Sequence, residues 1–334
     1  MILEQQFSRS VLVTGGAGFI GSNFLRAVCT SQDYQDVKFT CIDKLSYVSD
    51  NTTKFIDDLL KEDNFEFIKA DISEEYDLLY RLIVEQELFT DVIHFAAESS
   101  VDRSFEDPLF FTKNNVLAAQ NLLECVRLIG NKRGDPHHVK FIHISTDEVY
   151  GEQRTNESAA ENTLLSPSNP YSASKGAIDL IINAYIKSFQ LFAVLIRSNN
   201  VYGYHQYPEK IIPMTLYSLC HRQPIRIHGD GHNKRRYLFI DDFVSAVLTV
   251  WNKSEPYEIY NVGSDDEVTN IDMVNLIIRQ YKQWKPYSTI PPITYVTDRK
   301  FNDDRYDVDF TKIRRLGWKP QTTLQQGLDK VIRS

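Results

Sequence analysis

Two adjacent carboxylates, Asp147 and Glu148, are the residues whose types and position most directly suggest chemistry. They follow Thr146 at the end of an apolar run that begins with Phe141 to Ile144. Like charges this close raise the pKa of one of the two groups, so the pair can provide one acid and one base. The alternative is a polar strand end at which Asp147 caps the next turn.

Three glycines, Gly15, Gly18 and Gly21, follow the apolar run Val11 to Val13 and open a segment with a helical period. This pattern lets the chain turn tightly, brings the backbone close to a pyrophosphate and places an anion at the helix N-terminus. Asp43 closes the second apolar run about 20 residues later, where an acid accepts the ribose hydroxyls of a dinucleotide and repels a 2′-phosphate. The motif predicts NAD as the cofactor; the alternative is an ordinary strand-to-helix turn.

A tyrosine and a lysine four residues apart, Tyr171 and Lys175, precede another helical segment and are expected on one helix face. An ammonium close to the phenol favours its ionised form. A free tyrosine titrates near pH 10, so a phenolate at neutral pH needs about 3 pKa units, or roughly 4 kcal/mol. The ammonium and an oxidised nicotinamide, both cationic, are the expected sources. A solvated surface pair is the alternative reading.

The elements that must position these groups are read from the periodicity. Short apolar runs rich in β-branched and aromatic residues alternate with longer helical segments, which predicts an α/β fold with a doubly wound parallel (Rossmann) sheet. The predicted domains are residues 1–203, which bind NAD and carry the catalytic motifs, and residues 204–334, a smaller mixed α/β substrate lobe from which some elements return to the first domain. The expected strands are Val11 to Val13, Val37 to Ile42, Phe65 to Ile68, Val92 to Phe95, Phe141 to Ile144 and Phe192 to Ile196.

Composition limits the function classes. The chain has 334 residues, of which 42% are hydrophobic, enough to bury a sizeable core. A net charge of −8 argues against a nucleic-acid partner. No apolar run approaches the roughly 20 residues of a membrane span, so we expect no membrane partner and a cytoplasmic location. The four cysteines lack metal-binding spacing and are expected to be buried free thiols, and we expect no metal site.

Together these motifs resemble the short-chain dehydrogenase/reductase superfamily, and the length and second lobe suggest its extended branch. Within that branch, Thr146-Asp147-Glu148 is similar to the nucleotide-sugar 4,6-dehydratases that act on dTDP-glucose or UDP-glucose. The segments His94 to Ser99, Arg197 to Gly203 and Gln206 to Pro213 resemble the same family. The choice between thymidine and uridine stays open. The cofactor-binding residues expected on this basis are Gly15, Gly18, Phe19, Ile20, Gly21, Asp43, Lys44, Asp71, Ile72, Ala96, Ala97, Tyr171 and Lys175.

The resemblance implies a mechanism in which oxidation at C4 makes the C5 proton acidic. Tyr171, held by Lys175, would take the C4 hydroxyl proton, with Thr146 bonded to the same oxygen. Glu148 would then abstract the C5 proton, and Asp147 would protonate the departing C6 hydroxyl. Two alternatives remain. A nucleotide-sugar 4-epimerase needs only the oxidation machinery, and a non-catalytic NAD-binding sensor needs neither step.

A nucleoside-diphosphate glucose substrate carries about two negative charges, and arginine matches phosphate geometry with paired donors. Two helices, residues 115–129 and 176–186, are apolar over more than one stripe. The resemblance implies a homodimer joined through a four-helix bundle of these helices; the alternative is deeper burial within one subunit. The expected substrate-binding residues are Lys210, Arg235 and Arg305 for the phosphates, Asn200 and Glu209 for the sugar, and Ser99 and Asn261.

Overall fold

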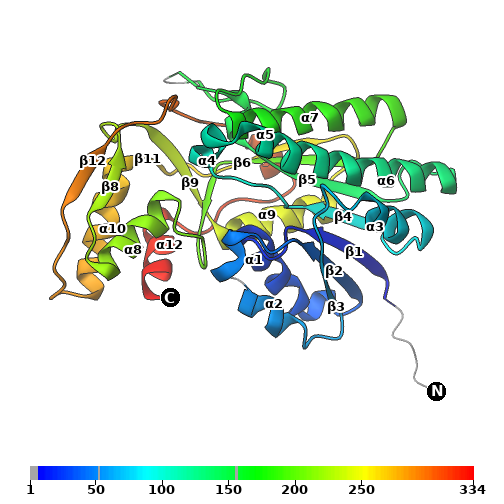
Figure 1. The fold of residues 1–334 in the computed structure, drawn as a ribbon, viewed down its shortest axis with the longest axis horizontal. Coiled ribbons are helices and arrows are strands. Elements are labelled where there is room, and N and C mark those ends of the chain that lie inside the picture. Colours follow the sequence, from blue (N-terminus) through cyan, green and yellow to red (C-terminus); the bar gives the residue numbers. More distant parts are fainter. Residues whose placement is uncertain (1–6, 52, 155–156) are drawn as a thin grey trace.

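The computed structural model describes residues 7–51, 53–154 and 157–334, arranged around one seven-stranded sheet (Figure 1). Its strands are β1 (Arg9–Thr14), β2 (Val37–Asp43), β3 (Phe65–Lys69), β4 (Asp91–His94), β5 (Lys140–Thr146), β6 (Ala193–Ser198) and β10 (Ile259–Val262). All neighbours pair in parallel, in the order β10-β6-β5-β4-β1-β2-β3. The order reverses between β1 and β4, so a crevice opens at the carboxyl ends of these strands. The predicted α/β doubly wound fold is confirmed.

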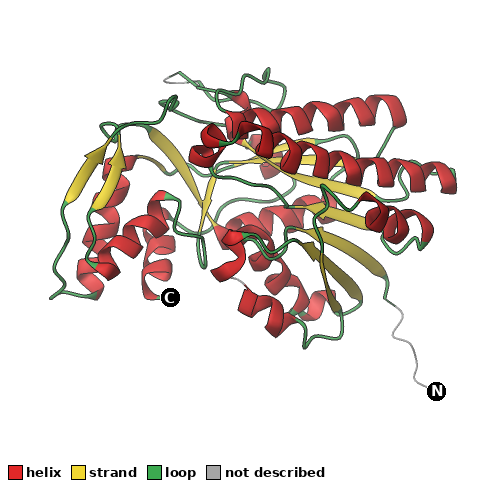
Figure 2. Ribbon diagram, viewed as in Figure 1, coloured by secondary structure: helices red, strands yellow, loops and turns green. Residues whose placement is uncertain are grey.

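Helices cover both faces of this sheet (Figure 2). Successive side chains of a strand point to opposite faces. Val11 and Val13 of β1 accordingly pack in one buried cluster with Phe24, whereas Leu12 packs in another with Leu122. The helices are α1 (Phe19–Cys29), α2 (Thr53–Leu59), α3 (Tyr76–Tyr80), α4 (Val101–Glu106), α5 (Pro108–Phe111), α6 (Ala118–Arg133), α7 (Pro170–Phe189), α8 (Ile211–His221), α9 (Ile240–Lys253), α10 (Asn270–Trp284), α11 (Thr311–Arg315) and α12 (Leu324–Arg333).

The start of α7 is specified locally, which matters because this helix carries Tyr171. Asn169 is the N-cap and its side chain accepts from the backbone N–H of Ser172, while the Ser172 hydroxyl is bonded back to Asn169. Pro170 occupies the first helical position, where its missing N–H costs nothing. This capping box fixes the point at which the loop ends and Tyr171 enters the helix.

A smaller lobe follows β6 and lies at the left in Figure 1. It contains a three-stranded sheet, ordered β11-β9-β7, and the parallel pair β12-β8. The chain also returns from this lobe, because β10 pairs with β6 and α9 packs against α1 on the large sheet. Residues after 203 therefore contribute to both parts. The lobe strands are β7 (Asn200–Tyr202), β8 (Ile225–His228), β9 (Lys234–Phe239), β11 (Glu267–Thr269) and β12 (Ile293–Val296).

Cys220 corrects the expectation of buried free thiols. The other three cysteines are buried and unpaired, but Cys220 is exposed. Helix α8 buries Ile212, Thr215 and Leu219, which follow one another at intervals of three and four residues and leave Cys220 off the packed side. Within the described ranges, no helix is long and apolar enough to cross a membrane, and no cluster of three or more potential metal ligands occurs.

Candidate active site

A cavity of about 400 Å³ opens at the carboxyl ends of the central strands and extends to the smaller lobe. It brings together most of the residues expected to bind the cofactor or substrate. Three residues, Asp147, Asn261 and Arg305, do not line it. The residues that do are Gly15, Gly18, Phe19, Ile20, Gly21, Asp43, Lys44, Asp71, Ile72, Ala96, Ala97, Ser99, Thr146, Glu148, Tyr171, Lys175, Asn200, Glu209, Lys210 and Arg235.

The glycine turn after β1 leaves no room for side chains. Gly15 adopts a φ of +73°, and a Cβ atom there would collide with the backbone of Ala96, in the segment that follows β4. A Cβ atom on Gly21 would collide with the carbonyl oxygen of Gly15. Gly18 is the N-cap of α1, whose first turn contains no acidic side chain. The close backbone and the free helix N-terminus fit a pyrophosphate.

Asp43 ends β2 with its carboxylate held in place at the cavity wall. Its Oδ2 accepts from the backbone N–H of Ala17 at 3.0 Å, and its Oδ1 accepts from that of Leu45 at 2.8 Å. Burial raises the pKa of this carboxyl, while the two backbone hydrogen bonds lower it. Each oxygen keeps a further lone pair, so the group can also accept ribose hydroxyls. These residues fit an adenosine ribose.

The positive charge of Lys44, beside Asp43, is balanced by a neighbouring carboxylate. Its ammonium lies 3.5 Å from Asp71 Oδ2 and donates to Asn114 Oδ1. A cation already paired with a carboxylate offers less attraction to a ribose 2′-phosphate. The environment of Lys44 therefore fits NAD better than NADP.

Asp147 and Glu148 occupy different environments although they are adjacent. Asp147 is 3% exposed and accepts at Oδ2 from Asn199 Nδ2 at 2.8 Å and at Oδ1 from the Thr146 hydroxyl at 3.2 Å. Glu148 lines the cavity and accepts from Asn169 Nδ2 at 3.1 Å. It is Thr146, not Asp147, that caps the following turn, because its Oγ1 accepts from the backbone N–H of Glu148 at 3.3 Å.

The environment of Asp147 suits an acid at neutral pH. Burial raises its pKa to about 7 from an ordinary 3.8, and the negative charge of Glu148 adds to the rise. Hydrogen bonds from Asn199 and Thr146 and the positive charge of Arg235 act in the opposite direction. A carboxyl group with a pKa near 7 is protonated in a substantial fraction of molecules at neutral pH and can donate that proton.

Tyr171 and Lys175 are both buried on α7, but the expected support of the lysine for the phenolate is not found. The Lys175 ammonium donates to the carbonyl oxygen of Ile144 at 2.5 Å. Burial lowers the pKa of Lys175 to about 8. Burial also raises the pKa of Tyr171 above its usual value, as do the charges of Glu148 and Asp147, whereas a hydrogen bond with Thr146 lowers it. A neighbouring carbonyl thus competes for the ammonium.

Three polar residues of the smaller lobe reach the cavity as expected. Glu209 accepts from the Tyr47 hydroxyl at 2.8 Å, and the Lys210 ammonium donates to the Ser99 carbonyl at 2.8 Å. The Arg235 guanidinium lies 4.6 Å from the centre of the Tyr306 ring and donates to Asn302 Oδ1 at 3.1 Å. These contacts hold two cations and one carboxylate at the cavity wall.

The side chains of Asn261 and Arg305 are bound by other groups of the protein. Asn261 is completely buried, accepts from the Tyr150 hydroxyl at 2.7 Å and donates to two backbone carbonyls. Arg305 pairs with Glu267 and Asp307, each at 2.6 Å, and also donates to two backbone carbonyls. The structure therefore does not bring either side chain to a ligand in the cavity. The residue types alone could not predict these partners.

Sequence reasoning missed Arg226, one of the cations of the cavity wall. Arg226 lines the cavity from β8, and its guanidinium has no ion-pair or hydrogen-bond partner among the described residues. Arg299 also lines it, bound to Asp102 by two contacts of 2.7 and 3.0 Å. Arg226 alternates with buried Ile225 and Ile227, which is the one local signal that its side chain leaves the core.

Comparison with known proteins identifies the family of the chain. Residues 12–331 match the family model described as GDP-mannose 4,6 dehydratase. The chain is 47% identical to an uncharacterized protein of Schizosaccharomyces pombe over 98% of both chains, and 38% identical to a dTDP-D-glucose 4,6-dehydratase of Mus musculus over 98% of this chain and 88% of that one.

A crystal structure of a dTDP-glucose 4,6-dehydratase from Streptomyces venezuelae with NAD bound has the same fold. It covers 97% of this chain and 96% of its own, with a TM-score of 0.84 and 33% identity. The family model, the relatives and the solved structure thus agree on one family. The chain belongs to the nucleotide-sugar 4,6-dehydratase family of extended short-chain dehydrogenases/reductases.

Proposed function

We propose that this protein is an NAD-dependent dehydratase that converts a nucleoside-diphosphate glucose, dTDP-glucose or UDP-glucose, to the 4-keto-6-deoxy sugar. The observation that carries the proposal is the division between the adjacent carboxyl groups. Buried Asp147 has a pKa raised to about 7, while Glu148 faces the cavity. Such a pair can supply a proton at one atom of a substrate and remove one from another.

The cofactor would lie against the glycine turn and Asp43. NAD bound there supplies a hydride acceptor, and its positive ring favours the phenolate form of Tyr171, whose own surroundings raise its pKa. Tyr171 takes the proton of the C4 hydroxyl, and Lys175 and Thr146 orient the phenol and that oxygen. The required shift of the tyrosine is thus assigned mainly to the cofactor charge.

Elimination follows from the chemistry of the C4 ketone. Because the carbonyl acidifies C5–H, Glu148 can remove that proton as a general base. Asp147 protonates the leaving C6 hydroxyl, so that water departs and the C5–C6 double bond forms. Hydride return to C6 and proton return to C5 complete the 4-keto-6-deoxy product. Asp147 does not itself line the cavity, but its Oδ1 is bonded to Thr146, which does.

The substrate phosphates are assigned to Lys210 and Arg235, and the sugar to Ser99, Asn200 and Glu209. All five line the same cavity as the carboxylates. The two cations match the charge of a diphosphate. Neither thymidine nor uridine is favoured by these contacts, so both nucleotides are proposed as substrates.

We also propose a homodimer through the helices α6 and α7. Large apolar side chains remain exposed on α7, where Leu180 is 59% and Phe189 42% exposed, and directly before α6, where Leu117 is 40% exposed. Exposed apolar side chains along a helix pair are typical of an association surface. Light scattering at micromolar concentration should give twice the mass of one chain; a monomer alone would reject the dimer.

Product analysis tests the activity. The protein is incubated separately with dTDP-glucose and UDP-glucose in deuterated water, and the product is examined by mass spectrometry and NMR. A 4-keto-6-deoxy sugar with deuterium at C5 supports the proposal. A galactose-configured product would show a 4-epimerase instead, because the groups for C4 oxidation also serve that reaction. Failure to turn over either sugar would favour a non-catalytic NAD-binding protein.

A further inference from the structure

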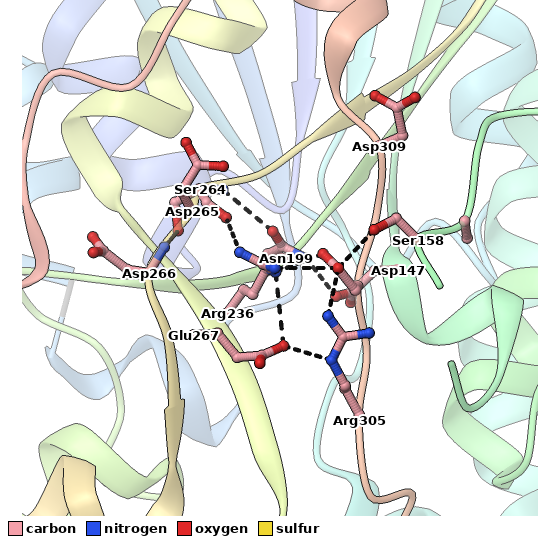
Figure 3. A network of polar contacts seen from close by, with 12 residues as sticks. Asp147, Ser158, Asn199, Arg236, Ser264, Asp265, Asp266, Glu267, Arg305 and Asp309 are labelled. Carbon is pink, nitrogen blue, oxygen red and sulfur yellow. Dashed lines mark hydrogen bonds and ion pairs between the residues drawn. The ribbon is translucent and has the colours of Figure 1, made fainter. Parts of the chain in front are cut away.

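Asn199 is hydrogen-bonded to the proposed acid Asp147 and lies at the point where the chain leaves the large sheet. It occupies the single position between β6 and β7, and its side chain is 2% exposed. Its Nδ2 donates to Asp147 Oδ2 at 2.8 Å, a contact that is visible in Figure 3. Asn199 has no role in the catalytic steps described above.

The orientation of the Asn199 amide is determined by its other partner. Its Oδ1 accepts from the backbone N–H of Ser264 at 3.3 Å. A backbone N–H can only donate, so the amide oxygen must face Ser264 and the NH₂ group must face Asp147. Gly263 leaves the space for this arrangement, because a Cβ atom there would collide with Asn199 Oδ1.

The segment that carries Ser264 is itself anchored. The Ser264 hydroxyl donates to the carbonyl oxygen of Tyr237 at 2.7 Å, and the Ser264 carbonyl accepts from Arg236 at 3.3 Å. Arg236 also pairs with Asp307, with Nε and Oδ1 2.5 Å apart. Arg305 binds the same carboxylate, so the network in Figure 3 runs without a break from Arg305 to Asp147. Arg236 and Arg305 therefore help to hold the segment of Ser264 in place.

We propose that Asn199 is a positioning residue that leaves Asp147 Oδ1 as the only oxygen able to carry the acidic proton. The NH₂ group of Asn199 cannot accept a hydrogen bond, so a proton on Asp147 Oδ2 would have no acceptor there. Oδ2 must therefore remain unprotonated and accept from Asn199. On the other side, protonation of Asp147 reverses the hydrogen bond between Thr146 and Oδ1, so that Oδ1 donates to Thr146 Oγ1. Thr146 Oγ1 can accept this bond, because a hydroxyl has two lone pairs and gives only one to the Glu148 N–H. The proton is thereby directed toward the cavity. This reading of the proton as catalytic rests on the proposed dehydratase function.

The Asn199 amide also affects the titration of Asp147, which can be measured without turnover. The Asn199 hydrogen bond lowers the pKa of Asp147, against the raising effects of burial and of Glu148. The other charged group acting on it is Arg235, which lowers the pKa, and Tyr171 is a further titratable neighbour. Loss of the Asn199 amide should therefore raise the pKa of Asp147.

The test combines NMR and kinetics on Asn199→Ala. In protein with ¹³C-labelled aspartate, the Asp147 signal is identified by its loss in Asp147→Asn, and its midpoint should rise by about one to two pH units in Asn199→Ala. Asn64→Ala is the matched control, because Asn64 is as deeply buried and donates to two carbonyls far from the site. Its Asp147 midpoint should equal that of the wild type.

Dehydration by Asn199→Ala should slow by about 10- to 100-fold, with the descending limb of its pH profile moved upward and C4 oxidation retained. Asn199→Asp keeps the side-chain size but removes the donor, so it should raise the Asp147 midpoint further and serves if the alanine variant does not fold. An unchanged midpoint in a folded variant would overturn the inference. A wild-type protein that dehydrates no nucleotide sugar would instead reject the proposed function, while the NMR titration would still judge the role of Asn199.

Discussion

Replacing Asp147 with asparagine should stabilise the folded protein, and more so at high pH than at low pH. The pKa of Asp147 is raised from 3.8 to about 7 in the folded state. The folded protein therefore binds more protons than the unfolded chain between these values, and stability falls as the pH rises through this range. The asparagine variant lacks this ionisation and should escape the loss.

The expected size follows from the two pKa values. A rise of about 3 units makes the ionised carboxyl cost roughly 4 kcal/mol at pH 8, but only about 1.5–2 kcal/mol at pH 5. These figures are ceilings, since the asparagine must still bond to Asn199 and Thr146. Urea unfolding of Asp147→Asn and wild type at both pH values measures the difference. An Asp147→Asn protein that is no more stable at pH 8, or that gains equally at pH 5, would refute the assigned environment of Asp147.

Three further results are expected. Glu148→Gln should keep NAD binding and some C4 oxidation but lose solvent exchange at C5; exchange at the wild-type rate, followed by NMR, would remove Glu148 from its role. Gly21→Ala should lower the NAD content of the purified protein, because its methyl group would collide with the backbone of Gly15. Gly134→Ala is the control and should leave the NAD content unchanged, because nothing lies within 4 Å of a Cβ atom there. Absorbance after denaturation measures the NAD content. Asp179 and Arg197 form a buried ion pair 2.8 Å apart. Asp179→Asn or Arg197→Met alone should each lower the free energy of unfolding by about 3–5 kcal/mol, and the double variant should lower it by less than the sum. Urea unfolding measures these losses, and full additivity would argue against the pair.

The sheet and its nucleotide site were accessible from sequence because their signals are local. A parallel strand buried on both faces reads as a continuous apolar run, as at Val11 to Val13. The glycine turn and Asp43 lie at fixed distances along the chain, and each has a steric or charge requirement of its own. The adjacency of Asp147 and Glu148 likewise needed no knowledge of the fold.

The contacts of individual side chains were not accessible in this way. Lys175 was expected near the tyrosine hydroxyl, but the carbonyl of Ile144 on the adjoining strand accepts from its ammonium. Arg305 was expected near phosphates, but Glu267 and Asp307 surround it. Both outcomes depend on partners that are brought in by strand register and by the C-terminal segment. Spacing along the chain carries no information about such partners.

The same reason explains the residues that were overlooked or misjudged. Asn199 contacts Asp147 only because β6 lies beside β5 with Ser198 opposite Thr146. Cys220 is exposed because α8 buries one face alone. These features follow from tertiary packing, which decides the roles of single polar residues more than it decides the fold class.

The most direct test of the dehydratase mechanism follows a label within one substrate molecule. Nucleoside-diphosphate glucose carrying deuterium at C4 is converted in ordinary water, and the product is analysed by NMR. The mechanism predicts that the deuterium moves from C4 to C6, while C5 receives hydrogen from the solvent. Deuterium that returns to C4 of a galactose-configured sugar, or that is absent from C6 of a deoxysugar, would contradict it.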